Sequence, residues 1–122
     1  PRYVLENVVN NFFEMPANTI REQTFCCGSG AGLNAGENME LRMAGGFPRA
    51  NAVKYVHEEF GVNMLACVCA IDRAALPASM GYWVPEVDVT GLTELVANAL
   101  IMPGEKDRET DLRGEPLPGM EE

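Results

Sequence analysis

The sequence predicts an α/β domain with a short, mostly parallel sheet and flanking helices. Segments with apolar residues at helical spacing alternate with short apolar runs along residues 1–102. Helices that alternate with buried strands favour parallel pairing, because a parallel pair needs a long crossover connection. The chain has 122 residues, of which 47% are hydrophobic, so we expect one domain with its own core.

The N-terminal half is expected to be mainly helical. Residues 2–14 carry valine, leucine and phenylalanine at helical spacing, and Pro16 should end that helix. Residues 20–25 suit a short strand that leads into a cysteine-bearing loop. A short helix from Glu37 should end at the Gly45-Gly46 pair, and a second helix should start at Pro48 and close at Gly61.

The C-terminal half is expected to supply the main strands. Residues 62–70 form a nearly unbroken apolar run, which is typical of a strand buried on both faces. Asp72 is then expected as the N-cap of the following helix. A second short strand near residues 87–89 leads to Thr90, the expected N-cap of a helix over residues 91–101.

Residues 103–122 differ in composition from the rest of the chain. They hold seven acidic and three basic residues, three prolines and no aromatic residue, so we predict a flexible acidic tail. The net charge of the whole chain is -9, which argues against a nucleic-acid partner, because phosphate binding needs clustered Lys and Arg. No apolar run is long enough to cross a bilayer, and no signal peptide is visible in residues 1–20, which carry Glu6 and Glu14 and lack an apolar core.

The four cysteines form two clusters. Cys26 and Cys27 are adjacent on a glycine-rich loop, and Cys67 and Cys69 lie at the carboxyl end of the predicted strand, on one face of it. Because open α/β sheets place ligands at the carboxyl ends of their strands, the two clusters are expected to meet in space. Asp72 follows Cys69 by three residues. Arg42, Arg49 and Lys54 are basic residues that could border such a site.

Several kinds of chemistry compete for these cysteines. Adjacent cysteines do not suit an ordinary disulfide, and a structural zinc site would need C-x-x-C pairs. The G-x-G-x-x-A match at residues 30–35 lacks the strand and the acidic residue of a nucleotide site. Converging thiolates beside backbone N–H groups favour an iron–sulfur cluster, and glycines let the backbone approach it. Buried free cysteines, a reactive dithiol and an interaction module without a loaded cluster remain alternatives.

The stretches FCCGSGAGLN and ACVCAIDRAALP resemble the cysteine-rich CCG domain of heterodisulfide-reductase-type proteins. Together with MELRMAGGFPRANAVKYV they look like the C-terminal part of a DsrK-type subunit of the dissimilatory sulfite-reduction membrane complex. The resemblance covers residues 1–102. It implies an incomplete CCG-type iron–sulfur domain, because the family motif includes a further upstream cysteine that this chain lacks.

The resemblance implies an oxidoreductase that acts on sulfur groups through a non-cubane [4Fe–4S] cluster. The implied catalytic residues, which are also metal ligands, are Cys26, Cys27 and Cys69. Asp72 stands where the motif has its last cysteine, and Cys67 is an alternative ligand at that position. The neighbours expected to bind the cofactor through backbone or charge are Gly28, Gly30 and Arg73.

The resemblance also implies partners and a location. Electrons would pass between a quinone pool and a DsrC-like sulfur-carrier protein that bears a disulfide or trisulfide. The other implied partners are a quinone-reactive cytochrome b-type membrane subunit and the remainder of the chain's own subunit. The implied location is cytoplasmic, peripheral on the inner face of the cell membrane.

Overall fold

We describe a computed structural model that places residues 1–33, 36–104 and 116. The predicted acidic tail, residues 103–122, lies almost entirely outside these described residues. Four helices and two strands follow one another along the chain: α1 (Arg2–Val8), α2 (Met39–Phe60), β1 (Met64–Cys67), α3 (Ala70–Trp83), β2 (Asp88–Gly91) and α4 (Leu92–Ala99). Three short 3-10 turns lie at Ala17–Thr19, Arg21–Gln23 and Gly36–Asn38.

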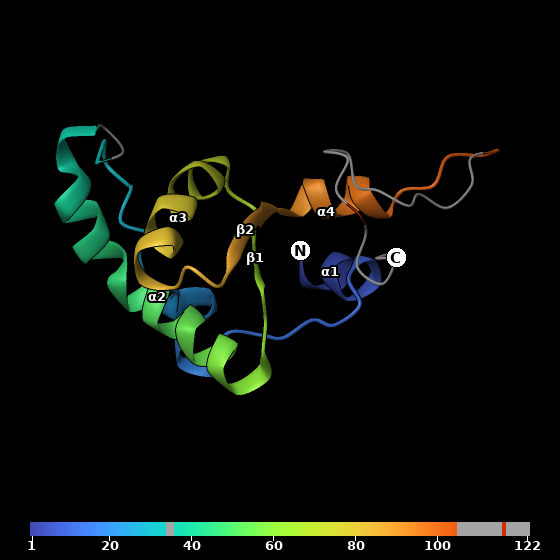
Figure 1. The fold of residues 1–122 in the computed structure, drawn as a ribbon, viewed down its shortest axis with the longest axis horizontal. Helices are drawn as coiled ribbons and strands as arrows, with labels where there is room; N and C mark the ends of the chain where they lie inside the picture. The colour runs from blue at the N-terminus through green and yellow to red at the C-terminus, as the bar shows by residue number, and fades with distance from the viewer. Residues whose placement is uncertain (34–35, 105–115, 117–122) are drawn as a thin grey trace.

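The two strands pair in parallel, with Met64 opposite Asp88 and Cys67 opposite Gly91. Helix α3 makes the crossover between them, as a parallel pair requires. Helices α2 and α3 lie on one side of the strand pair, and α1 and α4 lie on the other (Figure 1). The predicted α/β class with parallel strands and flanking helices is therefore confirmed.

The buried core forms where α2, β1, α3 and the turn before β2 meet. Its buried members are Ala50, Val53, Cys67, Leu76, Met80, Val84 and Val87. Cys67 is thus a core residue as well as the last residue of β1, whereas Cys69 is exposed.

Helix α2 corrects the prediction of two separate helices. It runs unbroken through Gly45-Gly46 and Pro48 and ends where Gly61 takes a left-handed conformation with φ of 69°, as expected. Pro48 removes one helical N–H, yet the buried residues Arg42, Gly46 and Ala50 recur every four positions across it. Tertiary packing of this continuous face outweighs the local helix-breaking signals.

The segment before α2 also differs from its prediction. Helix α1 ends at Val8, and Val9 is already extended, so Phe12 and Phe13 lie on a connecting strap rather than on the helix. Phe13 stacks on Phe60 with 5.1 Å between ring centroids, and this contact draws the strap toward α2. Residues 21–23 form a 3-10 turn in place of the expected strand.

Three boundaries around the strands are corrected. Strand β1 covers only residues 64–67, and Met64 at its start is 42% exposed, so it is not buried on both faces. The N-cap position of α3 is held by Cys69, and Asp72 lies in the first turn of that helix. Thr90 belongs to β2, and Gly91 is the N-cap of α4. Helix α3 therefore begins earlier than the predicted cap Asp72 indicated, and α4 begins one residue later than the predicted cap Thr90 indicated.

Candidate functional site

The loop with the adjacent cysteines directs two backbone N–H groups at its own sulfur atoms. The N–H of Gly28 donates to Sγ of Cys26 at 3.2 Å, and the N–H of Ser29 hydrogen-bonds the sulfur of Cys27. Both bonds span two residues, so the same turn serves each thiol. N–H donors favour the anionic form of a sulfur atom, which is the form that binds metal.

This loop is fixed to helix α2 by a contact between glycines. Gly28 has a φ of 86°, and a Cβ built on it would lie 2.3 Å from the carbonyl oxygen of Arg42 and 2.9 Å from the backbone nitrogen of Gly46. A Cβ on Gly46 would in turn approach the carbonyl oxygen of Cys27 to 3.0 Å. The close approach that these glycines permit is therefore between loop and helix.

The second pair of cysteines does not share one strand face, contrary to expectation. Because β1 ends at Cys67, Cys69 has left the strand and occupies the N-cap of α3. Cys67 is buried in the core and Cys69 is exposed. The carboxyl end of β1 therefore offers one inward and one outward thiol.

Asp72 links the two clusters. Burial raises the pKa of the Cys27 thiol, and the hydrogen bond from this thiol to the Asp72 carboxylate raises it further, while the Ser29 N–H acts in the opposite direction. Burial also raises the pKa of Cys67 to about 11, with the negative charge of Asp72 as the next cause. Two thiols that are 40 residues apart in sequence thus interact with one carboxylate.

The basic and glycine residues of the predicted site have distinct positions. The Arg73 guanidinium pairs with Glu94 of α4 through two hydrogen bonds of 2.7 and 3.3 Å, and its charge also reaches Cys67. Arg49 likewise acts electrostatically on Cys67, and its guanidinium donates to the carbonyl oxygen of Phe25. The other three lie apart from these interactions: Arg42 is buried, Lys54 pairs with Glu58, and no atom lies within 4 Å of a Cβ built on Gly30.

The thiol and carboxylate groups of this site have the chemistry of an iron–sulfur site, but they do not form a complete set of ligands. Thiolates are the ligands of such clusters, and Cys27 and Cys67 would have to lose their protons to bind iron. Within the described ranges, however, no three His, Cys, Asp or Glu side chains converge closely enough to hold one metal ion. The residues present fit part of a ligand set.

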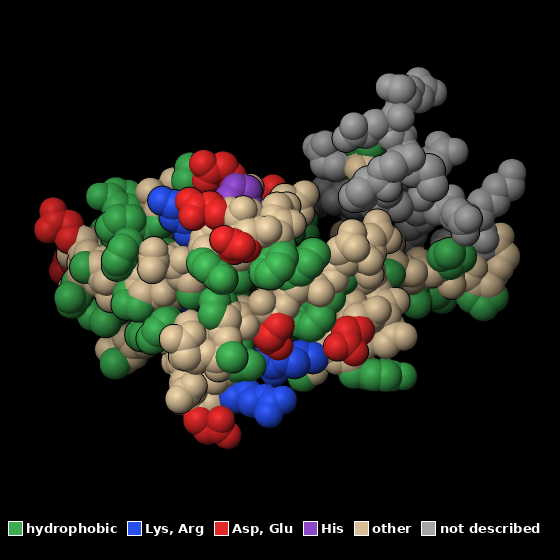
Figure 2. All heavy atoms as spheres, turned by 90° about the horizontal axis from the view of Figure 1, so that it is seen from below, with side chains coloured by type: hydrophobic (Ala, Val, Ile, Leu, Met, Phe, Trp, Pro, Cys, Tyr) green, Lys and Arg blue, Asp and Glu red, His purple; other side chains and the backbone are tan. Residues whose placement is uncertain are grey.

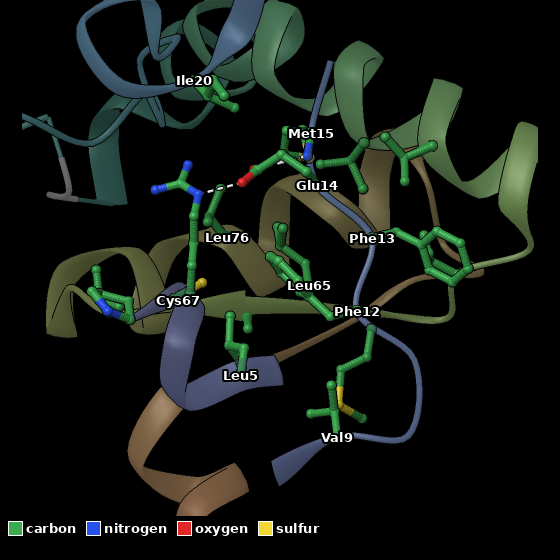
Figure 3. A pocket seen from close by; sticks show the side chains of 18 of the residues that line it. Leu5, Val9, Phe12, Phe13, Glu14, Met15, Ile20, Leu65, Cys67 and Leu76 are labelled. Atoms are coloured by element: carbon green, nitrogen blue, oxygen red, sulfur yellow. Dashed lines mark hydrogen bonds and ion pairs between the residues drawn. The ribbon is translucent and has the colours of Figure 1, made fainter. Parts of the chain in front are cut away.

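An apolar cleft of about 440 Å³ reaches this site from the direction of α1. Leu5, Phe12 and Leu65 line its body, and Cys67 lies at one end, as Figure 3 shows. Asp72 and Arg49 also border the cleft. An ion pair between Arg2 and Glu14 crosses it, drawn as a dashed line in Figure 3.

The surface offers little sign of a polyanion partner. On the face drawn in Figure 2 the few Lys and Arg side chains stand beside acidic ones. In the part of the chain that the structure describes, no helix combines the length and apolar character needed to cross a membrane.

Three contributors to the site were not predicted from sequence. The backbone N–H of Ser29 hydrogen-bonds Cys27, Gly46 allows the cysteine loop to pack against α2, and Glu94 accepts a hydrogen bond from Arg73. A glycine inside a helix whose buried face continues past it is a signal that could have identified Gly46. The roles of Ser29 and Glu94 depend on loop geometry and on the packing of α4, which leave no local pattern.

The fold and the site together define an α/β domain with clustered thiols at the carboxyl end of a parallel strand pair. The chain is 53% identical over 121 residues to the Hdr-like menaquinol oxidoreductase iron-sulfur subunit 2 of Archaeoglobus fulgidus, over 96% of the chain and 22% of that protein. It is 51% identical, with the same coverage, to the Hdr-like menaquinol oxidoreductase iron-sulfur subunit of Archaeoglobus profundus. The chain thus spans about a fifth of the length of these curated relatives.

These similarities confirm the coarser part of the predicted resemblance: the chain is homologous to a region of Hdr-like iron–sulfur subunits. No protein-family model matches the chain. No solved structure matches it either.

Proposed function

We propose that this chain is the cysteine-rich region of an iron–sulfur electron-transfer subunit in a quinol-linked, heterodisulfide-reductase-like complex. The observation that carries the proposal is the interaction of Asp72 with Cys27 from one cluster and with Cys67 from the other. Groups from a loop and from a strand end thereby interact with the same carboxylate, although no three of them converge on one metal position within the described residues. The names of both relatives, as iron–sulfur subunits of menaquinol oxidoreductases, support this proposal.

In this proposal each residue of the site has a role. Cys26, Cys27 and Cys69 supply thiolates to a non-cubane [4Fe–4S] cluster of the CCG type. Cys67 or Asp72 completes the set contributed by this chain, and Gly28 and Ser29 orient the first two sulfurs through their N–H groups. A cluster bound there supplies one-electron transfer to or from a sulfur group. Gly30 and Arg73 border it.

The proposed reaction is electron exchange between a quinone pool and the disulfide or trisulfide of a DsrC-like carrier protein in dissimilatory sulfur metabolism. The proposed partners are that carrier, a cytochrome b-type membrane subunit and the rest of the longer subunit. The proposed location is the cytoplasmic face of the membrane. The exposed thiols of Cys26 and Cys69 support a site that a sulfur group on another protein can reach.

The test is iron and acid-labile sulfide analysis, with EPR, on the chain as part of the full-length polypeptide made anaerobically with cluster-assembly proteins. We expect several iron atoms per chain and a several-fold loss of iron in Cys27→Ser. Tyr82→Phe, a matched control near the far end of α3, should keep its iron. No iron in the parent protein, or equal iron in Cys27→Ser, would leave the alternative of an assembly module without a loaded cluster.

A further inference from the structure

The apolar cleft runs along the edge of β1 that faces away from β2. Every residue of the run 62–68 borders it, so the cleft follows the strand rather than touching one face of it. None of the four residues of β2 lines it. A cleft with this course occupies the position of a neighbouring strand.

The backbone of β1 presents unpaired groups to this cleft. The carbonyl oxygen of Asn63 accepts a hydrogen bond from the N–H of Asp88 at 2.9 Å, so residue 63 points toward β2. Because backbone groups alternate along a strand, those of Met64, Ala66 and Val68 point the opposite way. In the described part of the chain, no hydrogen bond from another segment reaches the backbone of these three residues.

Two helices and the connecting strap wall the cleft. Val53 and Val56 come from α2 on one side, Leu5 comes from α1 on the other, and Phe12 and Phe13 come from the strap. Figure 3 shows β1 passing between these two walls, with α2 on one side and α1 on the other. A strand added to the β1 edge would therefore be covered on both faces, as parallel sheets require.

The present sheet is small for its type. It has two strands of four residues each, and sheets usually need three or more strands for stability. Met64 at the start of β1 is 42% exposed, and Val68, which follows the buried Cys67, is 68% exposed. The β1 edge and these two residues are therefore more exposed than the end of the strand that packs in the core.

We propose that the edge of β1 accepts a third strand, an extended apolar segment in parallel orientation. The segment comes from the part of the longer protein that this chain does not span, since the chain covers only 22% of each relative. A small apolar molecule could fill the same volume, but it would leave the backbone groups of residues 64, 66 and 68 without partners. An added strand would cover the apolar walls with its side chains and would form hydrogen bonds with the backbone groups at the edge of β1.

A parallel strand in this position would also matter for the thiols. Its carboxyl end would arrive beside the end of β1, next to Cys67 and Cys69. The loop after this strand would then approach the thiols, whose set of metal ligands is incomplete within the described residues. This consequence rests on the proposed function, whereas the strand addition itself does not.

The test compares backbone amide exchange in two samples. One is the 122-residue chain, and the other is the same chain substituted for the matched region of the full-length A. fulgidus relative. In the chain alone, the amides of Leu65 and Cys67 should be protected by β2, and those of Met64, Ala66 and Val68 should exchange quickly. In the full-length protein, the second group should exchange at least about 100-fold more slowly.

Proline variants provide the matched control. Ala66→Pro removes an outward N–H, which edge strands tolerate, so the chain alone should keep the protection of Leu65 and Cys67. Leu65→Pro removes an N–H that faces β2 and should abolish that protection. In the full-length protein, Ala66→Pro should cancel the new protection of residues 64 and 68.

Each alternative has its own signature. Equal exchange of residues 64, 66 and 68 in both samples would overturn the proposal and would leave a small-molecule cleft. Protection in the chain alone that grows with its concentration would overturn it in favour of a second copy. Iron content is measured separately, so a failure of the proposed function and a failure of strand addition can be told apart.

Discussion

Gly28 and Arg42 are in direct backbone contact: a Cβ on Gly28 would lie only 2.3 Å from the carbonyl oxygen of Arg42. Gly28 also has a φ of 86°, which L-residues rarely adopt. We expect Gly28→Ala to lower the free energy of unfolding by about 3 kcal/mol. Chemical denaturation of the chain measures this change.

Gly30 provides the control for that substitution. Nothing lies within 4 Å of a Cβ built on Gly30, and its φ lies outside the positive range. Gly30→Ala should therefore change the free energy of unfolding by less than about 0.5 kcal/mol. Similar losses in both variants would show that the contact with α2 does not anchor the loop.

Replacing Asp72 with asparagine should lower the pKa of the Cys27 thiol. The carboxylate raises this pKa through a hydrogen bond and through its charge, and both contributions disappear in Asp72→Asn. Burial is the largest cause, so the pKa should stay above its ordinary value. The pH dependence of Cys27 alkylation, followed by peptide mass spectrometry in metal-free protein, should shift to lower pH. Glu58→Gln, which affects only the partner of Lys54, should leave the curve in place.

The stability of the metal-free, reduced chain should fall at alkaline pH because of Cys67. Its pKa is about 11 in the folded state against an ordinary value of 9.0, so the folded protein holds this proton longer than the unfolded chain. The contribution is complete below pH 9.0 and is lost by about pH 11. Its full size is about 2 to 3 kcal/mol.

Urea denaturation at pH 8 and at high pH tests this dependence, with Cys67→Ala as the reference. The variant should be less stable at pH 8, because it leaves a cavity in the core. It should also lose less stability than the parent chain as the pH rises. Parallel curves for the two proteins would contradict the assignment to Cys67.

The ion pair of Arg73 and Glu94 should contribute little to stability. The two side chains are 35% and 40% exposed, so solvent screens their attraction. A double-mutant cycle with Arg73→Gln and Glu94→Gln should give a coupling free energy below about 1 kcal/mol. If Arg73 also borders a cluster, Arg73→Gln should lower the reduction potential of the loaded full-length protein, because a positive charge is lost. An unchanged potential would restrict Arg73 to its contact with α4.

The α/β class and the parallel pairing of the two strands could be predicted from sequence. They follow from a general rule, since helices that alternate with strands favour parallel pairing. The expected meeting of the two cysteine clusters stays a prediction. The path of α2 through Gly46 and Pro48 could not be predicted, because it depends on the backbone of Cys27 and the hydroxyl of Ser79 packing against Gly46. The packing of the cysteine loop against α2 also explains why position 28 requires glycine. From sequence, only the approach of a cluster seemed to require a glycine there.

The exposure of β1 also marks a limit of sequence reasoning. The apolar run 62–70 predicts burial on both faces, and Met64 and Val68 are nevertheless exposed in the described chain. The strand addition proposed above would cover these two side chains, and it would account for the difference between the predicted burial and the observed exposure.

The position of Gly46 has a further consequence for the thiols. A Cβ there would meet the carbonyl oxygen of Cys27 at 3.0 Å and the hydroxyl of Ser79 at 3.2 Å, so loop, α2 and α3 touch at one point. The adjacent thiols therefore move with a pair of packed helices rather than as a free loop. If the proposed cluster binds here, atoms held in this way would shift little when a charge arrives or leaves, and the reorganisation energy of electron transfer at these sulfurs should be small.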